Sequence, residues 1–186
     1  MTVGGFAEIE AKLQVASHAS LQAKLKTLGA EYLTDQEQED IYYDDTQANL
    51  LQADKALRLR IQKTEQGQQF FITFKGPKQT DDLKKRQEIE FTVEDAQAAQ
   101  QFLMALGYHA KLTVEKQRQV WRYRGCLVGL DHLAELGFFV EIEGPDSQRI
   151  RQVQRDLELT ERKHIQESYA CLIQGRAMED QHVSDS

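Results

Sequence analysis

Glu8-Ile9-Glu10-Ala11-Lys12, near the amino terminus, is the segment from which the architecture of this chain can be inferred. Its charged residues alternate with apolar or small ones at a period of two, the pattern of a β-strand with one charged and one apolar face. The motif Glu-Ile-Glu returns at 88–90 and at 141–143. For any single strand, the ordinary interpretation is a charged face exposed to water. Three copies favour another interpretation, in which several strands direct their carboxylates into a shared interior.

The composition indicates a globular protein with one domain. The chain has 186 residues, a formal net charge of −7 and 28% charged residues, which is typical of a folded protein. This charge gives no general attraction to a nucleic-acid polymer or an anionic membrane, and no apolar run matches a membrane span or a signal peptide. With only Cys126 and Cys171, neither a disulfide framework nor a zinc knuckle is expected. We predict a cytoplasmic protein with a single domain over 1–176 and a polar, frayed tail at 177–186.

About eight segments alternate as strands, and most of them are joined as hairpins. They are 6–15, 36–44, 56–63, 68–75, 84–93, 110–124 and the segments that follow Gly125 and Gly137. Helical spacing predicts helices that end at Leu28 and Leu106, and further helices at 147–158 and about 166–174. A large antiparallel sheet removes its unpaired edges by closing on itself. The sequence therefore predicts an α+β protein: an eight-stranded antiparallel closed β-barrel with helices packed outside.

The predicted strands carry cations as well as these glutamates. The cations are Lys12, Arg58, Arg60, Lys75, Lys116 and Arg118. Two like charges ~4 Å apart repel by on the order of 4 kcal/mol at an effective dielectric of 20, so six glutamates in one lumen require cations nearby. Carboxylates without His or Cys suit Mg²⁺ or Mn²⁺ rather than zinc, while Lys and Arg suit an anion with many oxygens. A polyphosphate bound together with divalent metal satisfies both groups.

These residues resemble the CYTH superfamily, which is named for class IV adenylyl cyclases and thiamine triphosphatases. Its hallmark, Glu-x-Glu-x-Lys in the first strand, matches Glu8, Glu10 and Lys12. The resemblance continues in order through ALRLR (56–60), TFKGP (73–77), KRQEIEF (85–91), EKQR (115–118) and LDHLAELGFFVEIE (130–143). It implies a triphosphate tunnel, an eight-stranded barrel that binds a triphosphate and divalent metal. The last of these segments is most similar to the class IV adenylyl cyclase branch.

The resemblance also implies roles for the charged residues. The implied ligands of two Mg²⁺ or Mn²⁺ ions are Glu8, Glu10, Asp131, Glu141 and Glu143. The implied triphosphate-binding residues are Lys12, Arg58, Arg60, Lys75, Arg86, Lys116 and Arg118. Glu88 and Glu90 either join the metal ligands or orient the cations through ion pairs, and Arg86 either binds phosphate or lies at an exposed rim.

The activity that the resemblance implies is that of an adenylyl cyclase, which converts ATP to cyclic AMP and pyrophosphate. One alternative is an inorganic or thiamine triphosphatase that releases orthophosphate. Another is a non-catalytic module that binds polyphosphate or a nucleotide. No residue stands out as a general base beyond the metal ligands, and a homodimer is a further implication of the resemblance.

Three expectations concern residues outside these roles. Trp121 falls on the face opposite Lys116 and Arg118, so it should pack outside the barrel. Tyr42 and Tyr43 are adjacent in a strand and point opposite ways, so one of them can line the tunnel. The remaining residues of the basic run 84–86 are expected to be ordinary surface charges.

Overall fold

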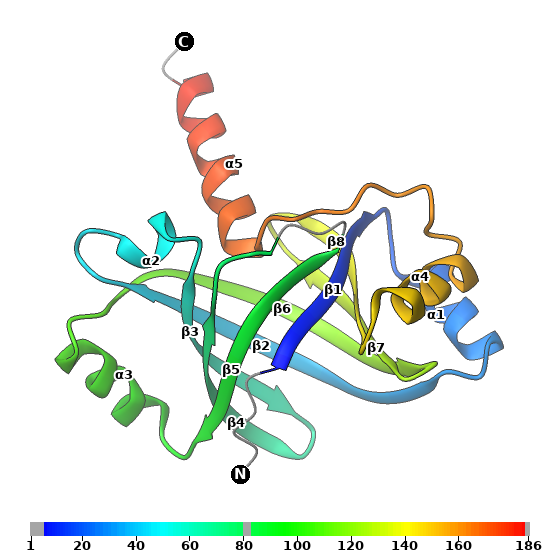
Figure 1. The fold of residues 1–186 in the computed structure, drawn as a ribbon, viewed down its shortest axis with the longest axis horizontal. Helices are drawn as coiled ribbons and strands as arrows, with labels where there is room; N and C mark the ends of the chain where they lie inside the picture. Colours follow the sequence, from blue (N-terminus) through cyan, green and yellow to red (C-terminus); the bar gives the residue numbers. More distant parts are fainter. Residues whose placement is uncertain (1–5, 80–82, 185–186) are drawn as a thin grey trace.

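The strands form a closed barrel in the computed structural model, which describes residues 6–79 and 83–184. The strands are β1 (Phe6–Val15), β2 (Glu31–Asp44), β3 (Ala56–Thr64), β4 (Gly67–Lys75), β5 (Lys84–Val93), β6 (His109–Tyr123), β7 (Cys126–Leu133) and β8 (Gly137–Glu143). Around the barrel their order is β1-β5-β4-β3-β2-β6-β7-β8, and neighbouring strands are antiparallel. Because β1 pairs with both β5 and β8, the sheet closes on itself (Figure 1). The predicted α+β fold with an eight-stranded antiparallel barrel is confirmed.

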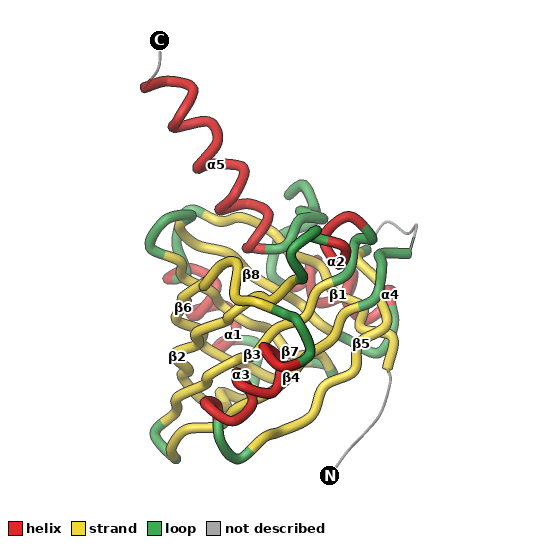
Figure 2. Tube along the Cα trace, turned by 90° about the vertical axis from the view of Figure 1, so that its left-hand side faces the viewer, coloured by secondary structure: helices red, strands yellow, loops and turns green. Residues whose placement is uncertain are grey.

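The helices in the described part of the chain lie outside this barrel (Figure 2). They are α1 (Ala19–Thr27), α2 (Asn49–Gln52), α3 (Ala96–Ala105), α4 (Ser147–Asp156) and α5 (Tyr169–Ser184). Helices α1 and α4 cover one side of the barrel together, α3 lies on the other side, and α5 projects from one end (Figure 1). None of the helices among residues 6–79 and 83–184 has the length and apolarity needed to cross a membrane.

Two elements are longer than the sequence indicated. Strand β2 begins at Glu31 rather than at 36, because its first residues pair with the end of the long strand β6, where Glu31 lies opposite Arg122. Helix α5 continues past its expected end near 174 to Ser184. Much of the expected frayed tail at 177–186 is therefore helical, and residues 185–186 lie outside the described residues.

The outward face of the strands carries the main apolar core. Leu13 of β1 and Val140 of β8 are fully buried in a cluster with residues of α1 and α4. Trp121 of β6 belongs to the same cluster, so its predicted position outside the barrel is confirmed. A second cluster, beneath α3, contains Tyr43, whereas Tyr42 lines the interior. The alternation of each strand therefore separates an apolar exterior from a polar interior.

A third apolar cluster closes one end of the interior. Phe139 of β8 and Leu133 of β7 are buried against Tyr169 and Ala170 at the start of α5. The rings of Phe139 and Tyr169 meet edge to face with their centroids 5.2 Å apart. The backbone N–H of Ile165 donates to the carbonyl of Lys12 in β1 at 2.8 Å. The segment that leads into α5 therefore covers this end of the barrel, from which α5 projects (Figure 1).

We expect Leu13→Ala to reduce the free energy of unfolding by about 2–5 kcal/mol, because it leaves a cavity among fully buried side chains of β1, β8 and α1. Chemical denaturation of the metal-free protein measures this change. Leu51→Ala is the control, because Leu51 is exposed and its truncation should change stability by no more than about 0.5 kcal/mol. Equal effects of the two substitutions would contradict this description of the core.

Candidate functional site

A cavity of about 900 Å³ occupies the barrel interior. The cations that line it are Lys12, Arg58, Arg60, Lys75, Lys84, Arg86, Lys116 and Arg118. The carboxylates that line it are Glu8, Glu10, Asp40, Glu88, Glu90, Glu141 and Glu143. All but one of the predicted site residues therefore line one cavity, and the exception, Asp131, lies directly behind two of the cations.

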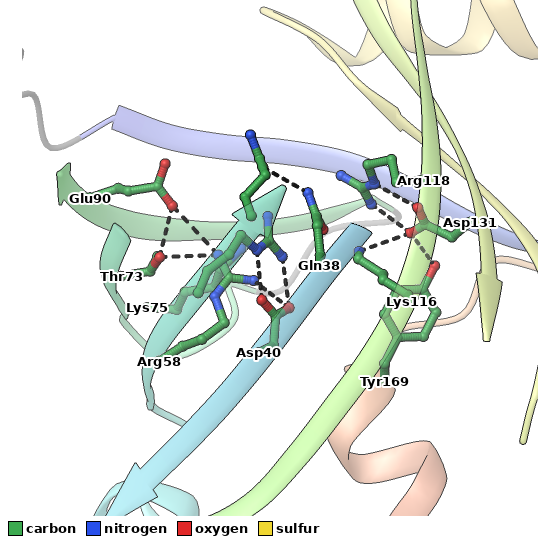
Figure 3. A network of polar contacts seen from close by, with 12 residues as sticks. Gln38, Asp40, Arg58, Thr73, Lys75, Glu90, Lys116, Arg118, Asp131 and Tyr169 are labelled. Atoms are coloured by element: carbon green, nitrogen blue, oxygen red, sulfur yellow. Dashed lines mark hydrogen bonds and ion pairs between the residues drawn. The ribbon is translucent and has the colours of Figure 1, made fainter. Parts of the chain in front are cut away.

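Asp131 anchors two cations of β6 and is fully buried (Figure 3). Its Oδ1 accepts a hydrogen bond from Arg118 Nε at 2.5 Å. Its Oδ2 accepts from Arg118 Nη2 at 2.6 Å, from Lys116 Nζ at 3.0 Å and from the Tyr169 hydroxyl at 2.9 Å. Burial alone would raise the pKa of Asp131, but the charges of Arg118 and Lys116 hold it below its ordinary value. Both oxygens of this predicted metal ligand are thus engaged in positioning cations.

Lys116 is a buried lysine with a shifted pKa. Burial and the neighbouring charge of Arg118 lower its pKa to about 8, although Asp131 and Glu141 act in the opposite direction. Near neutral pH the ammonium group is still mostly protonated and can attract an anion. Its attraction weakens as the pH rises through 8.

The Tyr169 ring forms the floor of the cavity beneath two lysines. Lys12 Nζ lies 4.1 Å from the ring centroid and Lys116 Nζ lies 4.9 Å from it, both close enough for cation–π attraction. Lys12 Nζ also donates to the carbonyl of Glu167 at 3.0 Å and lies 3.2 Å from Glu141 Oε1. The start of α5 therefore both closes the tunnel and holds a cation of the Glu-x-Glu-x-Lys motif in place.

Asp40 of β2 is the centre of a second buried group (Figure 3). Arg60 donates to both of its carboxylate oxygens, at 2.6 and 2.7 Å, and Arg58 Nη1 donates at 3.3 Å. Arg58 Nη2 also donates to Thr73 at 3.0 Å and to Glu90 at 3.5 Å. Burial alone would raise the pKa of Asp40, but the charges of Arg58 and Arg60 hold it well below its ordinary value. Asp40 therefore fixes the two arginines of the ALRLR segment.

Three glutamates of β1 and β5 are held by two lysines. Lys75 Nζ lies 2.7 Å from Glu8 and 2.8 Å from Glu88, bridging the two strands. Lys84 Nζ donates to Glu10 at 2.6 Å, and both side chains are buried. The expectation that Lys84 is a surface charge is therefore wrong, because β5 pairs it with Glu10 on the inward face.

Arg86 occupies the next inward position of β5 after Lys84. It is buried, and its Nη2 donates to the carbonyl and the carboxylate of Asp54, both at 3.1 Å. The alternative of an exposed rim position is therefore wrong. Its Nε has no hydrogen-bond acceptor among the described residues, so Arg86 keeps a donor that an anion in the cavity can use.

Glu143 of β8 lies among other carboxylates. Its enclosure raises its pKa to about 7, and the charges of Glu8, Glu10 and Glu88 add to this rise. Among residues 6–79 and 83–184, no three His, Cys, Asp or Glu side chains are already assembled as a metal site. The oxygen-only donor set nevertheless suits a hard divalent cation, and such an ion would relieve the mutual repulsion. These residues therefore fit Mg²⁺ or Mn²⁺ once Glu8 and Glu10 exchange their lysine partners for metal.

Three residues of the site, namely Asp40, Lys84 and Tyr169, were not assigned to it from the sequence. Asp40 shares its strand face with Tyr42, and Lys84 shares its face with Arg86, so strict alternation could have placed both inside. Neither belongs to a repeated Glu-Ile-Glu motif, which is why both were passed over. Tyr169 reaches the cavity from the start of a helix, and no strand periodicity indicates it.

Comparisons with known proteins agree with this architecture. The family model described as the CYTH domain matches residues 7–169. The protein named "Putative adenylate cyclase MJ0240" from Methanocaldococcus jannaschii is 31% identical over 136 residues, which cover 73% of this chain and 75% of that protein. The solved structure of PH1819 from Pyrococcus horikoshii has a TM-score of 0.79 and 30% identity, covering 91% of this chain and 99% of that chain.

A further solved structure is similar in fold alone. HpAC1 from Hippeastrum, described as a putative adenylyl cyclase that reveals a dominant triphosphatase activity, has a TM-score of 0.71 at 16% identity. The similarity covers 90% of this chain and 95% of that chain. Proteins of this fold therefore bear the names of both activities that the sequence left open.

We expect Glu143→Gln to raise the melting temperature of the metal-free protein at pH 8 but not at pH 4. The Glu143 carboxyl has a pKa of about 7 when folded and an ordinary value of 4.5. Between these values the folded state retains a proton that the unfolded state has lost, so the wild type loses stability as the pH rises through this range. Thermal unfolding in EDTA at several pH values measures the difference. Glu65→Gln, in an exposed turn, is the control, and a pH-independent gain for Glu143→Gln would contradict the assignment.

Proposed function

The chain belongs to the CYTH domain family, and from this membership we propose that it is a divalent-metal-dependent enzyme that converts ATP to cyclic AMP and pyrophosphate. The observation that carries the proposal is the closed barrel whose cavity is lined with lysines, arginines and carboxylates. The relative from Methanocaldococcus jannaschii, which bears an adenylate cyclase name, supports the choice of reaction. A mononucleotide triphosphate, rather than a nucleic-acid polymer, is the proposed ligand.

The cavity cations are the proposed contacts of the triphosphate. Lys12 reaches the cavity from β1, Lys116 and Arg118 reach it from β6, and Arg58 and Arg60 reach it from β3. Each is held by a carboxylate, so little side-chain freedom is lost when it binds phosphate. Hydrogen bonds from these side chains to the departing pyrophosphate would stabilise the negative charge that develops there.

The charge of the cavity supports a requirement for metal. Eight cations and seven carboxylates line it, so the side chains leave a net charge of only +1 to meet a triphosphate with several negative charges. Bound Mg²⁺ or Mn²⁺ ions, two in this proposal, would neutralise phosphate charge and lower the pKa of the attacking hydroxyl. We assign them to Glu8, Glu10 and Glu143, with Glu88 and Glu141 beside them. Lys75 and Lys84, which hold three of these carboxylates, would turn to phosphate oxygens in exchange.

In the cyclase reaction, the 3′-hydroxyl of the ribose attacks the α-phosphorus, a new P–O bond forms, and the bond to pyrophosphate breaks. The role of the protein side chains is to hold the α-phosphate near the hydroxyl and the other two phosphates against the cations. We assign no side chain as general base. Asp131 and Asp40 act as positioning residues, because the carboxylate oxygens of each accept hydrogen bonds from the cations.

A triphosphatase is the second candidate. In that reaction water attacks the terminal phosphorus, the P–O bond to the next phosphate breaks, and the products are orthophosphate and a diphosphate. The observation that favours it is the row of cations that continues to the closed end of the tunnel at Lys12 and Tyr169, which suits a linear polyphosphate. The fold shared with HpAC1 is compatible with this candidate.

Product analysis separates the candidates. The purified protein is incubated with Mg²⁺ or Mn²⁺ and, separately, with ATP, tripolyphosphate and thiamine triphosphate. Cyclic AMP together with pyrophosphate is the expected result with ATP. Orthophosphate without cyclic AMP would refute the cyclase and establish the triphosphatase. Tight binding of polyphosphate without turnover of any substrate would leave a non-catalytic binding module.

We expect Glu10→Gln to lower the metal-dependent rate by roughly 100-fold or more, since even the loss of a group that merely supports a metal ligand costs 10–100-fold. The initial rate at saturating Mn²⁺ and ATP measures this change. Glu37→Gln is the matched control, because Glu37 is an exposed residue on the outward face of β2. Wild-type activity in Glu10→Gln would remove Glu10 from the proposed metal ligands.

A further inference from the structure

Three glutamines form an amide cluster on the inner wall of the barrel, on strands β2 and β3. Gln38 Nε2 donates to Gln36 Oε1 at 2.6 Å and to Gln62 Oε1 at 3.0 Å. All three side chains line the cavity, and Gln38 is only 4% exposed. Both N–H groups of Gln38 are therefore used within the cluster. Its own Oε1 accepts no hydrogen bond from any residue in the ranges 6–79 and 83–184.

The amide cluster lies directly beside the cations that we assign to the triphosphate. In the pairing of β2 with β6, Gln38 lies opposite Lys116 and Gln36 lies opposite Arg118. Figure 3 shows Gln38 between the Asp40 group and the Asp131 group. The glutamates Glu8, Glu10 and Glu143 belong to β1 and β8, which are not neighbours of β2 or β3 in the barrel. The amides therefore lie on a different wall of the barrel from the proposed metal ligands.

Neutral side chains continue the lining on both sides of the amides. Val120 is the next inward residue of β6 after Arg118, and Phe71 of β4 lies opposite Arg60 of β3. Apolar and aromatic side chains next to amides offer contact to the flat face of a heterocycle. A bare polyphosphate has no group that gains from such a surface.

The unpaired acceptor indicates what kind of group the site lacks. A buried carbonyl oxygen without a donor destabilises the protein, and a ligand that supplies the donor recovers this loss. Phosphate oxygens accept hydrogen bonds, so they do not satisfy it. An ammonium group donates, but Lys116 and Arg118 would repel it. A neutral N–H donor on a planar ring satisfies the acceptor without this repulsion and also suits the apolar and aromatic lining beside it. The exocyclic amine of a nucleobase is such a donor.

We propose that Gln36, Gln38 and Gln62 form a nucleobase subsite that selects a triphosphate with an exocyclic amine on its base, adenine being the base of the proposed substrate. Gln38 Oε1 accepts a hydrogen bond from that amine, and Gln36 and Gln62 hold the Gln38 amide in orientation. The inference rests on the proposed triphosphate-binding function and adds its substrate class. It places the base against the wall formed by β6, β2, β3 and β4.

Equilibrium binding to the full chain tests this subsite without any need for turnover. The affinities of ATP, inosine triphosphate and tripolyphosphate are measured by calorimetry in EDTA, so that the metal-dependent reaction does not proceed. Inosine triphosphate carries a 6-oxo group where ATP carries the 6-amino group, and its oxygen would face Gln38 Oε1. We expect the wild type to bind ATP about tenfold more tightly than inosine triphosphate.

Gln38→Leu should abolish this preference and leave the affinity for tripolyphosphate within about twofold of the wild type. Unchanged tripolyphosphate binding also shows that the variant is folded. If Gln38→Leu loses that binding, Gln38→Met, with a side chain of similar length, is measured in the same way. Gln117→Leu is the matched control, because Gln117 is exposed on the outward face of β6.

Equal affinity of the wild type for ATP and inosine triphosphate would overturn the inference, whatever the variants do. A preference that survives in the folded Gln38 variant would overturn it too. In either case, binding of tripolyphosphate would leave the proposed triphosphate tunnel standing. If neither ATP nor tripolyphosphate binds in EDTA, the titrations are repeated with Mg²⁺, and the absence of both binding and turnover there would overturn the proposed function and the subsite together.

Discussion

Pairing of buried opposite charges is the constraint on which the rest of this structure depends. A closed barrel turns one face of every strand toward a confined interior, where an unpaired charge is strongly unfavourable. Here three deeply buried carboxylates each meet a cation from another strand: Asp131 holds Arg118, Asp40 holds Arg60, and Glu10 holds Lys84. The barrel therefore keeps a charged interior while its apolar core lies outside, beneath the helices.

The same pairing prepares the cavity for a charged ligand. Asp131 and Asp40 keep Lys116, Arg118, Arg58 and Arg60 extended and oriented, so these side chains are already positioned when an anion arrives. The pairs around Lys75 and Lys84 can exchange partners, because a metal ion replaces the lysine at the carboxylate and a phosphate replaces the carboxylate at the lysine. The pairs around Lys75 and Lys84 thus link metal binding to triphosphate binding, whereas the pairs of Asp131 and Asp40 preserve the geometry of the site.

Two walls of the interior differ in chemistry, and the difference follows the strand order. Strands β1, β5 and β8 are neighbours and contribute most of the glutamates, whereas β2 and β3 contribute the amides of Gln36, Gln38 and Gln62. In the proposed complex, metal and base thus contact different walls, with the triphosphate between them. The chain enters the cavity again at Tyr169, and this ring closes the end nearest Lys12.

The sequence by itself determined the inward faces of the strands, since alternation at a period of two places Glu8, Glu10 and Lys12 on one side whatever surrounds them. It also indicated the closed barrel and nearly all of the charged cavity lining. Only the tertiary structure decided which carboxylate meets which cation. That choice depends on register between strands distant in the chain, such as Glu10 opposite Lys84, and on a helix that brings Tyr169 to Asp131. Local periodicity carries no information on such contacts, because closure of the whole sheet creates them.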